Sequence, residues 1–383
     1  MLIAVPRETL LGENRASLVP DSVKKLVRAG ADVSIEAGMG EGAGFSDSDY
    51  QEAGASINAD RQQLLGSADI VLRIHKPTLD EVDLLKAGSI HVSFLDPFNE
   101  RELVEKMAAK NVSAISMEMI PRSTRSQKMD ALSSQANLAG YVMVIKAADA
   151  LNRILAMMMT PAGTLKPAKV FIIGAGVAGL QAIATAKRLG AKVTAFDTRE
   201  VVAEQVESLG GKFLKIDLGE TGQTKDGYAV ALTPEQMELQ KQGQMAEIAE
   251  SDVVITTAQL FGRKPPLIVS ADAVASMKPG SVIVDMAAEN GGNVEGSKAG
   301  ETVVTENGVS IVGTGNWSND VPRDASQMYS SNLFNLVDEF WDQEAKTLKL
   351  DFANEIATGC VITHDGSVVN EVIKNHYGNT PQS

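Results

Sequence analysis

The sequence contains 383 residues, which is more than one hydrophobic core usually organises, so we expect two domains. Its formal net charge of −14 argues against nucleic acid and anionic lipid as partners, because both are bound through clustered lysine and arginine side chains. The single cysteine excludes an internal disulfide and a cysteine-rich metal site, and the four scattered histidines predict no metal site.

The N-terminal portion of the chain alternates between strand and helix patterns, which is typical of a parallel sheet. The predicted strands cover residues 2–5, 32–36, 70–74, 90–94 and 113–117. Helices are predicted over residues 22–29 and 100–110. The opening strand pattern has no basic region or cleavage site, so it does not predict a signal peptide. A long helix is expected over 138–159, with Met157, Met158 and Met159 as core filling near its end.

The following portion repeats this alternation with short apolar strands, as in a sheet covered on both faces. These strands are predicted over residues 169–173, 192–196, 212–216, 252–257, 281–286 and 309–312. A second long helix over 326–340 precedes strand patterns at 348–352 and 360–363, and we expect the chain to return there to the first domain. The predicted domains are residues 1–132 plus 326–383, and residues 138–325.

A glycine-rich turn lies between the first strand and the first helix of this second domain. Gly174 allows the tight turn, Gly176 lets a pyrophosphate approach the backbone, and Gly179 lets the helix pack on the strand. The pyrophosphate would lie on the helix N-terminus, where unpaired N–H groups favour an anion. Asp197 ends the next strand, where it can bind a ribose 2′-hydroxyl and would repel a 2′-phosphate, so NAD(H) is favoured over NADP(H).

These patterns together predict an α/β fold. We expect two Rossmann-like domains with parallel sheets, joined by long helices around an interdomain cleft, which is a usual place for a cofactor. One segment, residues 217–244, departs from the alternation because it is long, polar and rich in Gly, Thr, Gln and Glu. A segment of this kind predicts either a lid over the cofactor or a tolerated insertion.

A second group of polar residues comes just before the first long helix. Asp130 and Ser133 can cap the helix by accepting from its free N–H groups. Capping alone does not require Arg122, Arg125 and Gln127 beside them. An arginine, a glutamine and an aspartate that converge on a cleft can hold a planar amide, such as the carboxamide of nicotinamide, through charge-assisted hydrogen bonds.

Over essentially its whole length the sequence resembles the NAD(H)-binding component, domain I, of the proton-translocating nicotinamide nucleotide transhydrogenases. The resemblance is densest at residues 121–141, 174–180, 204–213, 227–229 and 290–293. It implies that Arg122, Gln127, Asp130 and Ser133 position the nicotinamide. It implies cofactor contacts by Ser123, Thr124, Arg125, Gly174, Gly176, Val177, Ala178, Gly179, Asp197, Thr198, Arg199, Gly227, Tyr228, Gln240, Thr257, Ala258 and Gln259.

The family shares its plan with alanine dehydrogenase, which is the main alternative. Arg15 matches the arginine that binds the amino acid's carboxylate in that enzyme. Its catalytic lysine and histidine are matched by His75 and Asp96, and an aspartate of its site by Glu289. Loss of a proton-transfer histidine should slow such chemistry by about 10²- to 10⁴-fold, so these substitutions disfavour the alternative.

Direct hydride transfer between two nicotinamides fits the absence of a convincing base, because no proton is exchanged at the reacting carbons. The resemblance implies a Re/Si-specific NAD(P)⁺ transhydrogenase that is active only with partner subunits. One partner domain would carry NADP(H), and a membrane domain would conduct protons. We expect a homodimer in the cytoplasm, peripheral to the membrane through its partners. A non-catalytic NAD-binding regulatory subunit remains a further alternative.

Overall fold

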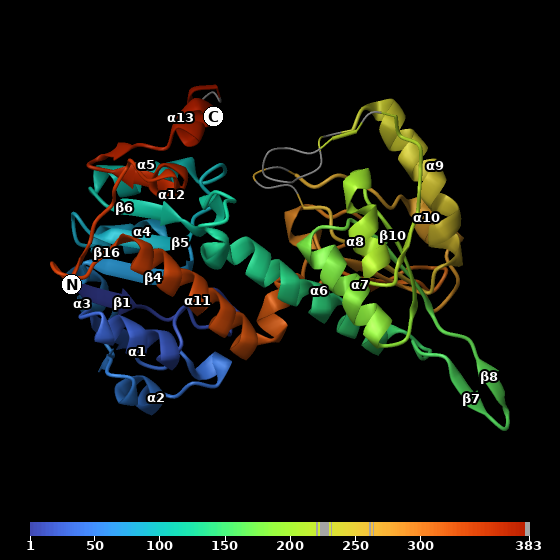
Figure 1. Cartoon of the computed structure of the whole chain (residues 1–383), viewed down its shortest axis with the longest axis horizontal. Coiled ribbons are helices and arrows are strands. Elements are labelled where there is room, and N and C mark those ends of the chain that lie inside the picture. Colours follow the sequence, from blue (N-terminus) through green and yellow to red (C-terminus); the bar gives the residue numbers. More distant parts are fainter. Residues whose placement is uncertain (220, 223–229, 231, 260–261, 263, 380–383) are drawn as a thin grey trace. The chain divides into compact units, whose positions relative to one another are not determined.

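The protein forms two compact units in the computed structural model, which describes residues 1–219, 221–222, 230, 232–259, 262 and 264–379 (Figure 1). Unit 1 contains Met1–Gln135 and Val321–Ser383, and unit 2 contains Ala136–Asp320. The helix α6 (Ala131–Ala150) begins in unit 1 and continues in unit 2. In the described part of the chain, no helix combines the length and apolar character that a bilayer crossing requires.

Unit 1 is built on an eight-stranded sheet. In spatial order its strands are β19 (Ser367–Val368), β18 (Val361–His364), β6 (Ser113–Ser116), β5 (Ile90–Phe94), β4 (Ile70–His75), β1 (Leu2–Val5), β2 (Asp32–Glu36) and β3 (Ser56–Asn58). The strands from β6 to β3 are parallel, whereas β18 pairs antiparallel with β6 and β19 pairs antiparallel with β18. Two segments from opposite ends of the sequence therefore complete one sheet.

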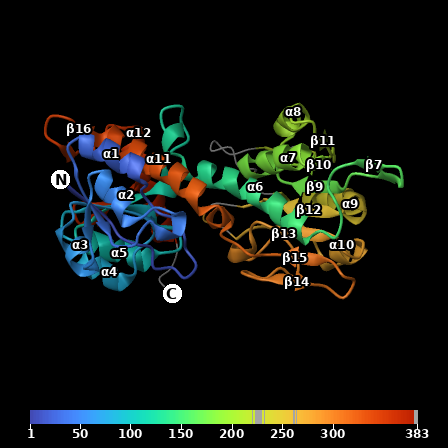
Figure 2. The ribbon, with the colours of Figure 1, turned by 90° about the horizontal axis from the view of Figure 1, so that it is seen from below.

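Helices cover both faces of this sheet, because its central strands are apolar on both sides. One face packs against α1 (Pro20–Arg28), α2 (Asp47–Glu52), α11 (Pro322–Phe340) and α12 (Glu355–Cys360). The other packs against α3 (Arg61–Ser67), α4 (Leu79–Leu84), α5 (Arg101–Ala109) and α13 (Glu371–Asn379). Figure 2 shows α1, α11 and α12 on one side of unit 1 and α3, α4 and α5 on the other.

Unit 2 has a seven-stranded sheet. Its strands, in spatial order, are β11 (Lys212–Phe213), β10 (Lys192–Phe196), β9 (Lys169–Ile173), β12 (Val253–Thr256), β13 (Val282–Asp285), β15 (Ser310–Val312) and β14 (Thr302–Val304). Only the β14–β15 pair among them is antiparallel. The helices α9 (Pro234–Glu250) and α10 (Ala271–Ser276) contribute to the core on one face, and α7 (Val177–Arg188) packs on β9 and β10. The predicted α/β fold with two parallel-dominated sheets is confirmed.

The predicted helix over 138–159 is wrong in its limits, because α6 ends at Ala150 and a hairpin follows. The hairpin consists of β7 (Met158–Thr160) and β8 (Gly163–Leu165), and Figure 1 shows it extending from the rest of unit 2. The expectation that the three methionines fill a core is also wrong, since Met157, Met158 and Met159 are 60%, 48% and 73% exposed. An apolar run does not by itself distinguish a buried helix end from an exposed strand.

Other elements were not predicted from the sequence because they bury few apolar side chains. The segment expected to be a polar loop contains the start of α9, where Thr233 and Gln236 form a capping box and Pro234 is the first helical residue. Along this helix only Gln244 and Ile248 are buried, so its apolar periodicity is weak. The strands β3 and β14 lie at sheet edges and bury little, which removes the alternation that predicts a strand.

Candidate functional site

The glycine turn that follows β9 has no room for side chains at two of its glycines. Gly174 has a φ of +100°, and a Cβ there would lie 2.4 Å from Thr257 Oγ1. A Cβ on Gly179 would lie 1.9 Å from the Gly174 carbonyl oxygen. That carbonyl accepts a hydrogen bond from the Thr257 hydroxyl at 3.1 Å, so the residue after β12 braces the turn. The first and third glycines are therefore required by the packing of the chain itself.

The second glycine faces open space. Beyond its chain neighbours, no atom of the described residues lies within 4 Å of the Cβ position of Gly176. Gly176 is also the N-cap of α7, and no described side chain caps that helix. Val177 is 38% exposed beside it, and Ala178 follows in the first turn. Free N–H groups at a helix start that is open to a ligand make this the natural place for a phosphate.

Asp197 follows β10, and donors of its own chain surround its carboxylate. Oδ2 accepts from the Ala175 N–H at 2.7 Å and from Arg199 Nη2 at 2.7 Å. Oδ1 accepts from the Arg199 N–H and from its Nε, both at 2.9 Å. Between them, the Thr198 carbonyl accepts from Thr221 Oγ1 at 2.7 Å. The bond to Ala175 attaches the acid directly to the glycine turn, and hydrogen bonding to Asp197 raises the pKa of Arg199.

The surface beside Asp197 is hollowed where β10 and β11 end. Apolar and polar side chains both line it, and the polar ones include Asp197, Glu200 and Lys215. Its residues include Phe196, Thr198, Phe213, Leu214, Ile216 and Leu218. In a doubly wound sheet, ligands bind at the carboxyl ends of the strands, and this hollow lies at such an end.

The predicted nicotinamide-positioning residues lie in unit 1, around a 3₁₀ turn η3 (Gln127–Met129). Asp130 accepts from the Ser133 N–H at 2.8 Å and from the Ser133 hydroxyl at 2.6 Å, so it caps the start of α6. Arg122 Nε lies 3.8 Å from Asp130 Oδ2. Both Arg122 and Gln127 are exposed. The fold thus brings Arg122, Asp130 and Ser133 together and presents Gln127 beside them, within one segment that we call the 122–133 loop.

The remaining residues of this loop have other partners. Ser123 donates its N–H to Ser126 Oγ at 3.0 Å, and Thr124 is exposed. Arg125 forms an ion pair with Glu339 of α11. Its guanidinium is thus bonded to a residue far away in the sequence, and the cofactor contact of Arg125 stays a prediction.

Two glutamines and their neighbours complete the predicted set in unit 2. Gln259 donates to the Met286 carbonyl at 3.3 Å, and the Ala258 carbonyl accepts from Asn293 Nδ2 at 3.0 Å. Gln240 lies half-buried on α9. The predicted contacts of Gly227 and Tyr228 fall outside the described residues.

Asn293 also donates to the Pro266 carbonyl at 2.8 Å, and it is fully buried. It therefore joins the segment after β12 to the segment that precedes α10, at the carboxyl edge of the sheet. Sequence reasoning noticed the surrounding Asn-Gly-Gly-Asn run only through the family resemblance. Asn293 binds backbone carbonyl groups, and because every residue has one, no sequence pattern could have predicted this role.

Two of the residues that match the amino-acid site of alanine dehydrogenase, Arg15 and His75, share Glu13 as an ionic partner in unit 1. Arg15 Nη2 lies 2.6 Å from Glu13 Oε2, and Arg15 Nη1 donates to Gln135 Oε1 at 3.0 Å. His75 Nε2 is 2.6 Å from the same Glu13 oxygen. Burial of Glu13 disfavours its charge, but the bonds to Arg15 and His75 outweigh this and hold the pKa of its carboxyl well below the usual range. Arg15, 7% exposed, is thus neutralised within the chain.

Comparison with known proteins was made over the whole chain. The family models of the N-terminal and C-terminal domains of alanine dehydrogenase/PNT match residues 4–139 and 143–371. An NAD(P) transhydrogenase subunit alpha chain of Rhodospirillum rubrum is 43% identical over 380 residues, covering 97% of this chain and 99% of that protein.

Two solved structures are also similar. The transhydrogenase of Sinorhizobium meliloti has a TM-score of 0.86 and 40% sequence identity, covering 96% of this chain and all of that one. An L-alanine dehydrogenase has a TM-score of 0.83 and 27% identity, and the match covers 99% of both chains. Sequence identity therefore separates two relatives whose folds are almost equally similar to this one.

Proposed function

Because the chain belongs to the alanine dehydrogenase/PNT family, we propose that it is the NAD(H)-binding component of a proton-translocating NAD(P)⁺ transhydrogenase. Similarity to a transhydrogenase alpha subunit along nearly the whole of both chains supports this over the dehydrogenase branch. The observation that carries the proposal is the bond between Asp197 and the Ala175 N–H, which joins the ribose-binding acid to the pyrophosphate turn.

Each part of NAD(H) has a matching group of residues. The pyrophosphate would bind at Gly176, Val177 and Ala178, where the start of α7 is open. The adenosine ribose would bind Asp197, with Thr198 and Arg199 beside it, and adenine would enter the neighbouring hollow, whose lining is mixed polar and apolar. Thr257, Ala258, Gln259 and Gln240, together with Gly227 and Tyr228, remain proposed cofactor contacts.

The 122–133 loop would hold the nicotinamide. Its carboxamide has a carbonyl acceptor and an NH₂ donor, which suit Arg122 and the Asp130 carboxylate, and the Gln127 side chain can serve either. Ser133 holds Asp130 through two hydrogen bonds and so fixes the direction of the carboxylate. Ser123 and Thr124 are the proposed secondary contacts in the same segment.

NADH supplies a hydride at its C4 carbon. In direct transfer this hydride passes to C4 of NADP⁺, leaving NAD⁺ and NADPH, and no proton is exchanged at either carbon. The chain's contribution is therefore to fix the ring and to exclude water, and a general base is not needed. The NADP(H) would be carried by a partner domain, since the sequence has one glycine fingerprint.

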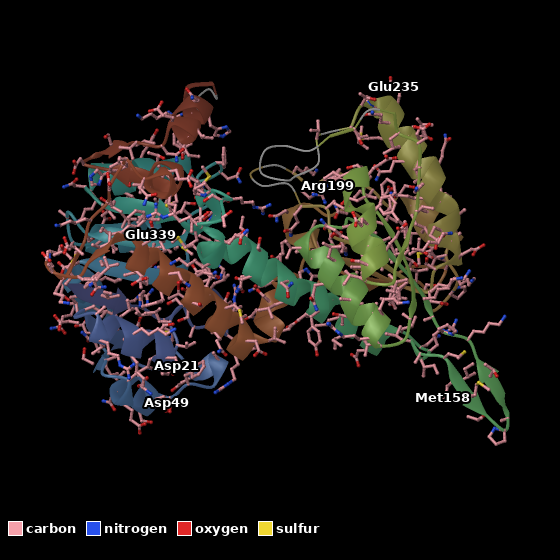
Figure 3. All side chains as sticks on the ribbon, in the orientation of Figure 1. Asp21, Asp49, Met158, Arg199, Glu235 and Glu339 are labelled. Atoms are coloured by element: carbon pink, nitrogen blue, oxygen red, sulfur yellow. The ribbon has the colours of Figure 1, made fainter. Side chains whose placement is uncertain are left out.

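The same proposal places the protein in the cytoplasm, attached to the membrane through a partner domain that conducts protons. The net charge of −14 supports attachment through protein, because an anionic bilayer surface would repel it. We further propose a homodimer, because the β7–β8 hairpin exposes several apolar side chains that solvent does not favour. Met158 marks this hairpin in Figure 3.

A reconstitution experiment tests the function. The purified chain should bind NADH yet oxidise none of it until an NADP⁺-loaded transhydrogenase partner is added, and NADPH should then form in step with NADH loss. Reduction of NAD⁺ by L-alanine without a partner would instead indicate the dehydrogenase, which the neutralised Arg15 disfavours. NADH binding without turnover under either condition would indicate a regulatory subunit.

A further inference from the structure

A polar stripe on the long helix α11 faces the 122–133 loop. Asn332, Asn335 and Glu339 are spaced by three and four residues, so their side chains share one face of the helix. The residues between them, Leu333, Leu336 and others, pack into the apolar core of unit 1. Polar side chains at the edge of a buried helix face need hydrogen-bond or ion-pair partners, and residues of the 122–133 loop provide them.

Asn332 makes the central contacts of this α11 stripe. Its Nδ2 donates to the Lys128 carbonyl at 3.0 Å, and its Oδ1 accepts from Ser134 Oγ at 2.7 Å. The side chain thereby joins the end of η3 to the first turn of α6, on either side of Asp130. Asn332 is 6% exposed, so water competes little for these bonds. Asn335 adds a longer bond to the same Lys128 carbonyl, at 3.4 Å.

Glu339 holds the other end of the loop. Its carboxylate forms the ion pair with Arg125 and accepts from Asn354 Nδ2 at 3.1 Å. The Glu339 side chain is only 8% exposed, whereas that of Arg125 is 63% exposed. A carboxylate on α11, in turn fixed by Asn354, therefore restrains a long, exposed side chain of the loop (Figure 3 labels Glu339).

Buried side chains of the loop itself add to these contacts. Met129 is fully buried in the same core as Leu333 and Leu336, and Ser126 is buried with its hydroxyl donating to the Ser123 carbonyl. Arg122 and Gln127 are exposed, and Arg122 Nε lies 3.8 Å from Asp130 Oδ2 within the loop. The backbone between Arg125 and Asp130 is thus set against α11 at three points: Glu339, Asn332 and the apolar contact of Met129.

We propose that Asn332 and Glu339 are positioning residues, which hold the 122–133 loop in the geometry that orients the nicotinamide, and that Arg125 is the loop's tether to Glu339. This inference rests on the proposed function of the loop. It reassigns Arg125, which acts through Glu339 and not through the cofactor. Displacement of a reacting group by about 1 Å can slow a reaction about 10²-fold, so a loosened loop should reduce turnover without removing a binding contact.

A double-mutant cycle tests the tether. Arg125→Ala, Glu339→Ala and the double variant should each lower kcat for hydride transfer by a similar factor, about 10-fold, while the Kd for NADH stays within about twofold. If Arg125 contacts the cofactor directly, its variant weakens NADH binding and the two losses multiply, which overturns the proposal. Glu371→Gln, which removes an exposed ion pair to Lys374 on α13, serves as the matched control.

The role of Asn332 is tested by comparing two alanine variants that lose different numbers of contacts with the loop. Asn332→Ala should lower kcat more than Asn335→Ala, because it loses both loop contacts whereas Asn335 loses one long one. Hydrogen exchange of the backbone amides of residues 122–133, measured on the free chain, should accelerate in Asn332→Ala and Glu339→Ala and not in Glu371→Gln. Equal exchange in all variants contradicts the proposal even if turnover falls.

The exchange measurement also separates this inference from the proposed function. If the wild-type protein has no transhydrogenase activity but its loop loosens in these variants, the tether stands and the proposed function fails. If the wild type is active and the variants leave both exchange and kcat unchanged, the tether is wrong and the function stands. Melting temperatures close to that of the wild type show that a loss of kcat is not global unfolding.

Discussion

The guanidinium of Arg199 donates two hydrogen bonds to the carboxylate of Asp197, which lies two residues earlier in the chain. Nε is 2.9 Å from Oδ1, and Nη2 is 2.7 Å from Oδ2. The pair is largely buried, with side-chain exposures of 13% and 6% for the arginine and the aspartate. The acid that should recognise a ribose is therefore also the counter-ion of the arginine nearest to it. Figure 3 labels Arg199, which follows the end of β10.

Coenzyme selectivity should depend on this pair. Asp197→Ala removes the acceptor for the 2′-hydroxyl and leaves Arg199 without its counter-ion, so NADH should bind about 10-fold more weakly while NADPH gains. Isothermal titration with both coenzymes measures the ratio. Glu204→Gln on α8 (Ala203–Ser208) makes a similar charge change at an exposed position and should leave the ratio unchanged. An unaltered NADH-to-NADPH ratio in Asp197→Ala would contradict the assignment of the ribose site.

Two glycines of the turn should respond differently to alanine. The methyl group of Gly176→Ala meets no described atom within 4 Å, and the φ of −79° suits any residue. The variant should therefore fold normally and lose NADH affinity about 10-fold or more. Gly179→Ala places a methyl group 1.9 Å from a carbonyl oxygen and should destabilise the fold by about 2–4 kcal/mol. Denaturant unfolding and NADH titration separate the outcomes. If Gly176→Ala binds NADH with wild-type affinity, the pyrophosphate does not bind at this turn.

The loop residues should affect transfer more than binding. In Gln127→Asn and Asp130→Asn the cofactor keeps its adenosine and pyrophosphate contacts, so the Kd for NADH should change by less than about threefold. The rate of hydride transfer should fall by about 10²-fold, because the ring loses its orientation. Stopped-flow single turnover with the NADP⁺-loaded partner measures the rate. A matched loss of rate and affinity would make the loop an affinity element only.

Stability should fall in mild acid because of His91. Burial and the nearby Arg73 charge lower the pKa of His91 to about 3, so the folded protein leaves the ring neutral. The unfolded chain takes up the proton near pH 6.5, so this contribution to stability is present above pH 6.5 and is lost as the pH falls toward 3. The slope is about 1.4 kcal/mol per pH unit.

His91→Asn should therefore be less stable than the wild type at pH 7.5 but lose less on acidification. Urea unfolding at pH 7.5, 6.5 and 5.5 measures the difference between the two proteins at each pH. If that difference does not shrink as the pH falls, the His91 ring is protonated in the folded state and its burial has a different energetic role.

The exposed hairpin should matter for assembly. Met159→Glu puts a charge on a side chain that is 73% exposed, so the monomer should fold as before and a dimer that buries the hairpin should dissociate. Val304→Glu, at a position 67% exposed on β14, is the matched control. Light scattering on both variants gives the mass. An unchanged dimer in Met159→Glu would place the dimer contact elsewhere.

The positions of the central strands along the chain and the glycine turn could be predicted because their signals are local. Short apolar runs predicted the central strands nearly to the residue, as for 90–94 and β5. Edge strands such as β3 bury few side chains, so they lack the apolar pattern that predicts a strand and were not predicted. The helix α9 escaped because its polar surface obscures the helical period. Apolar character also misplaced the three methionines, since burial depends on what surrounds a residue.

The site divides in the same way. Residue types and spacing along the chain determined the glycine turn, the acid at the end of β10 and the cluster at 122–133, because a turn, a cap and a strand end act over a few residues. Only the tertiary structure decided that the Glu13 carboxylate neutralises Arg15 while also contacting His75. It also decided that Glu339 and Asn332 hold a loop that lies about 200 residues earlier in the chain. Hydrogen bonds and ion pairs act over a few ångströms of space, and the chain brings such partners together only by folding.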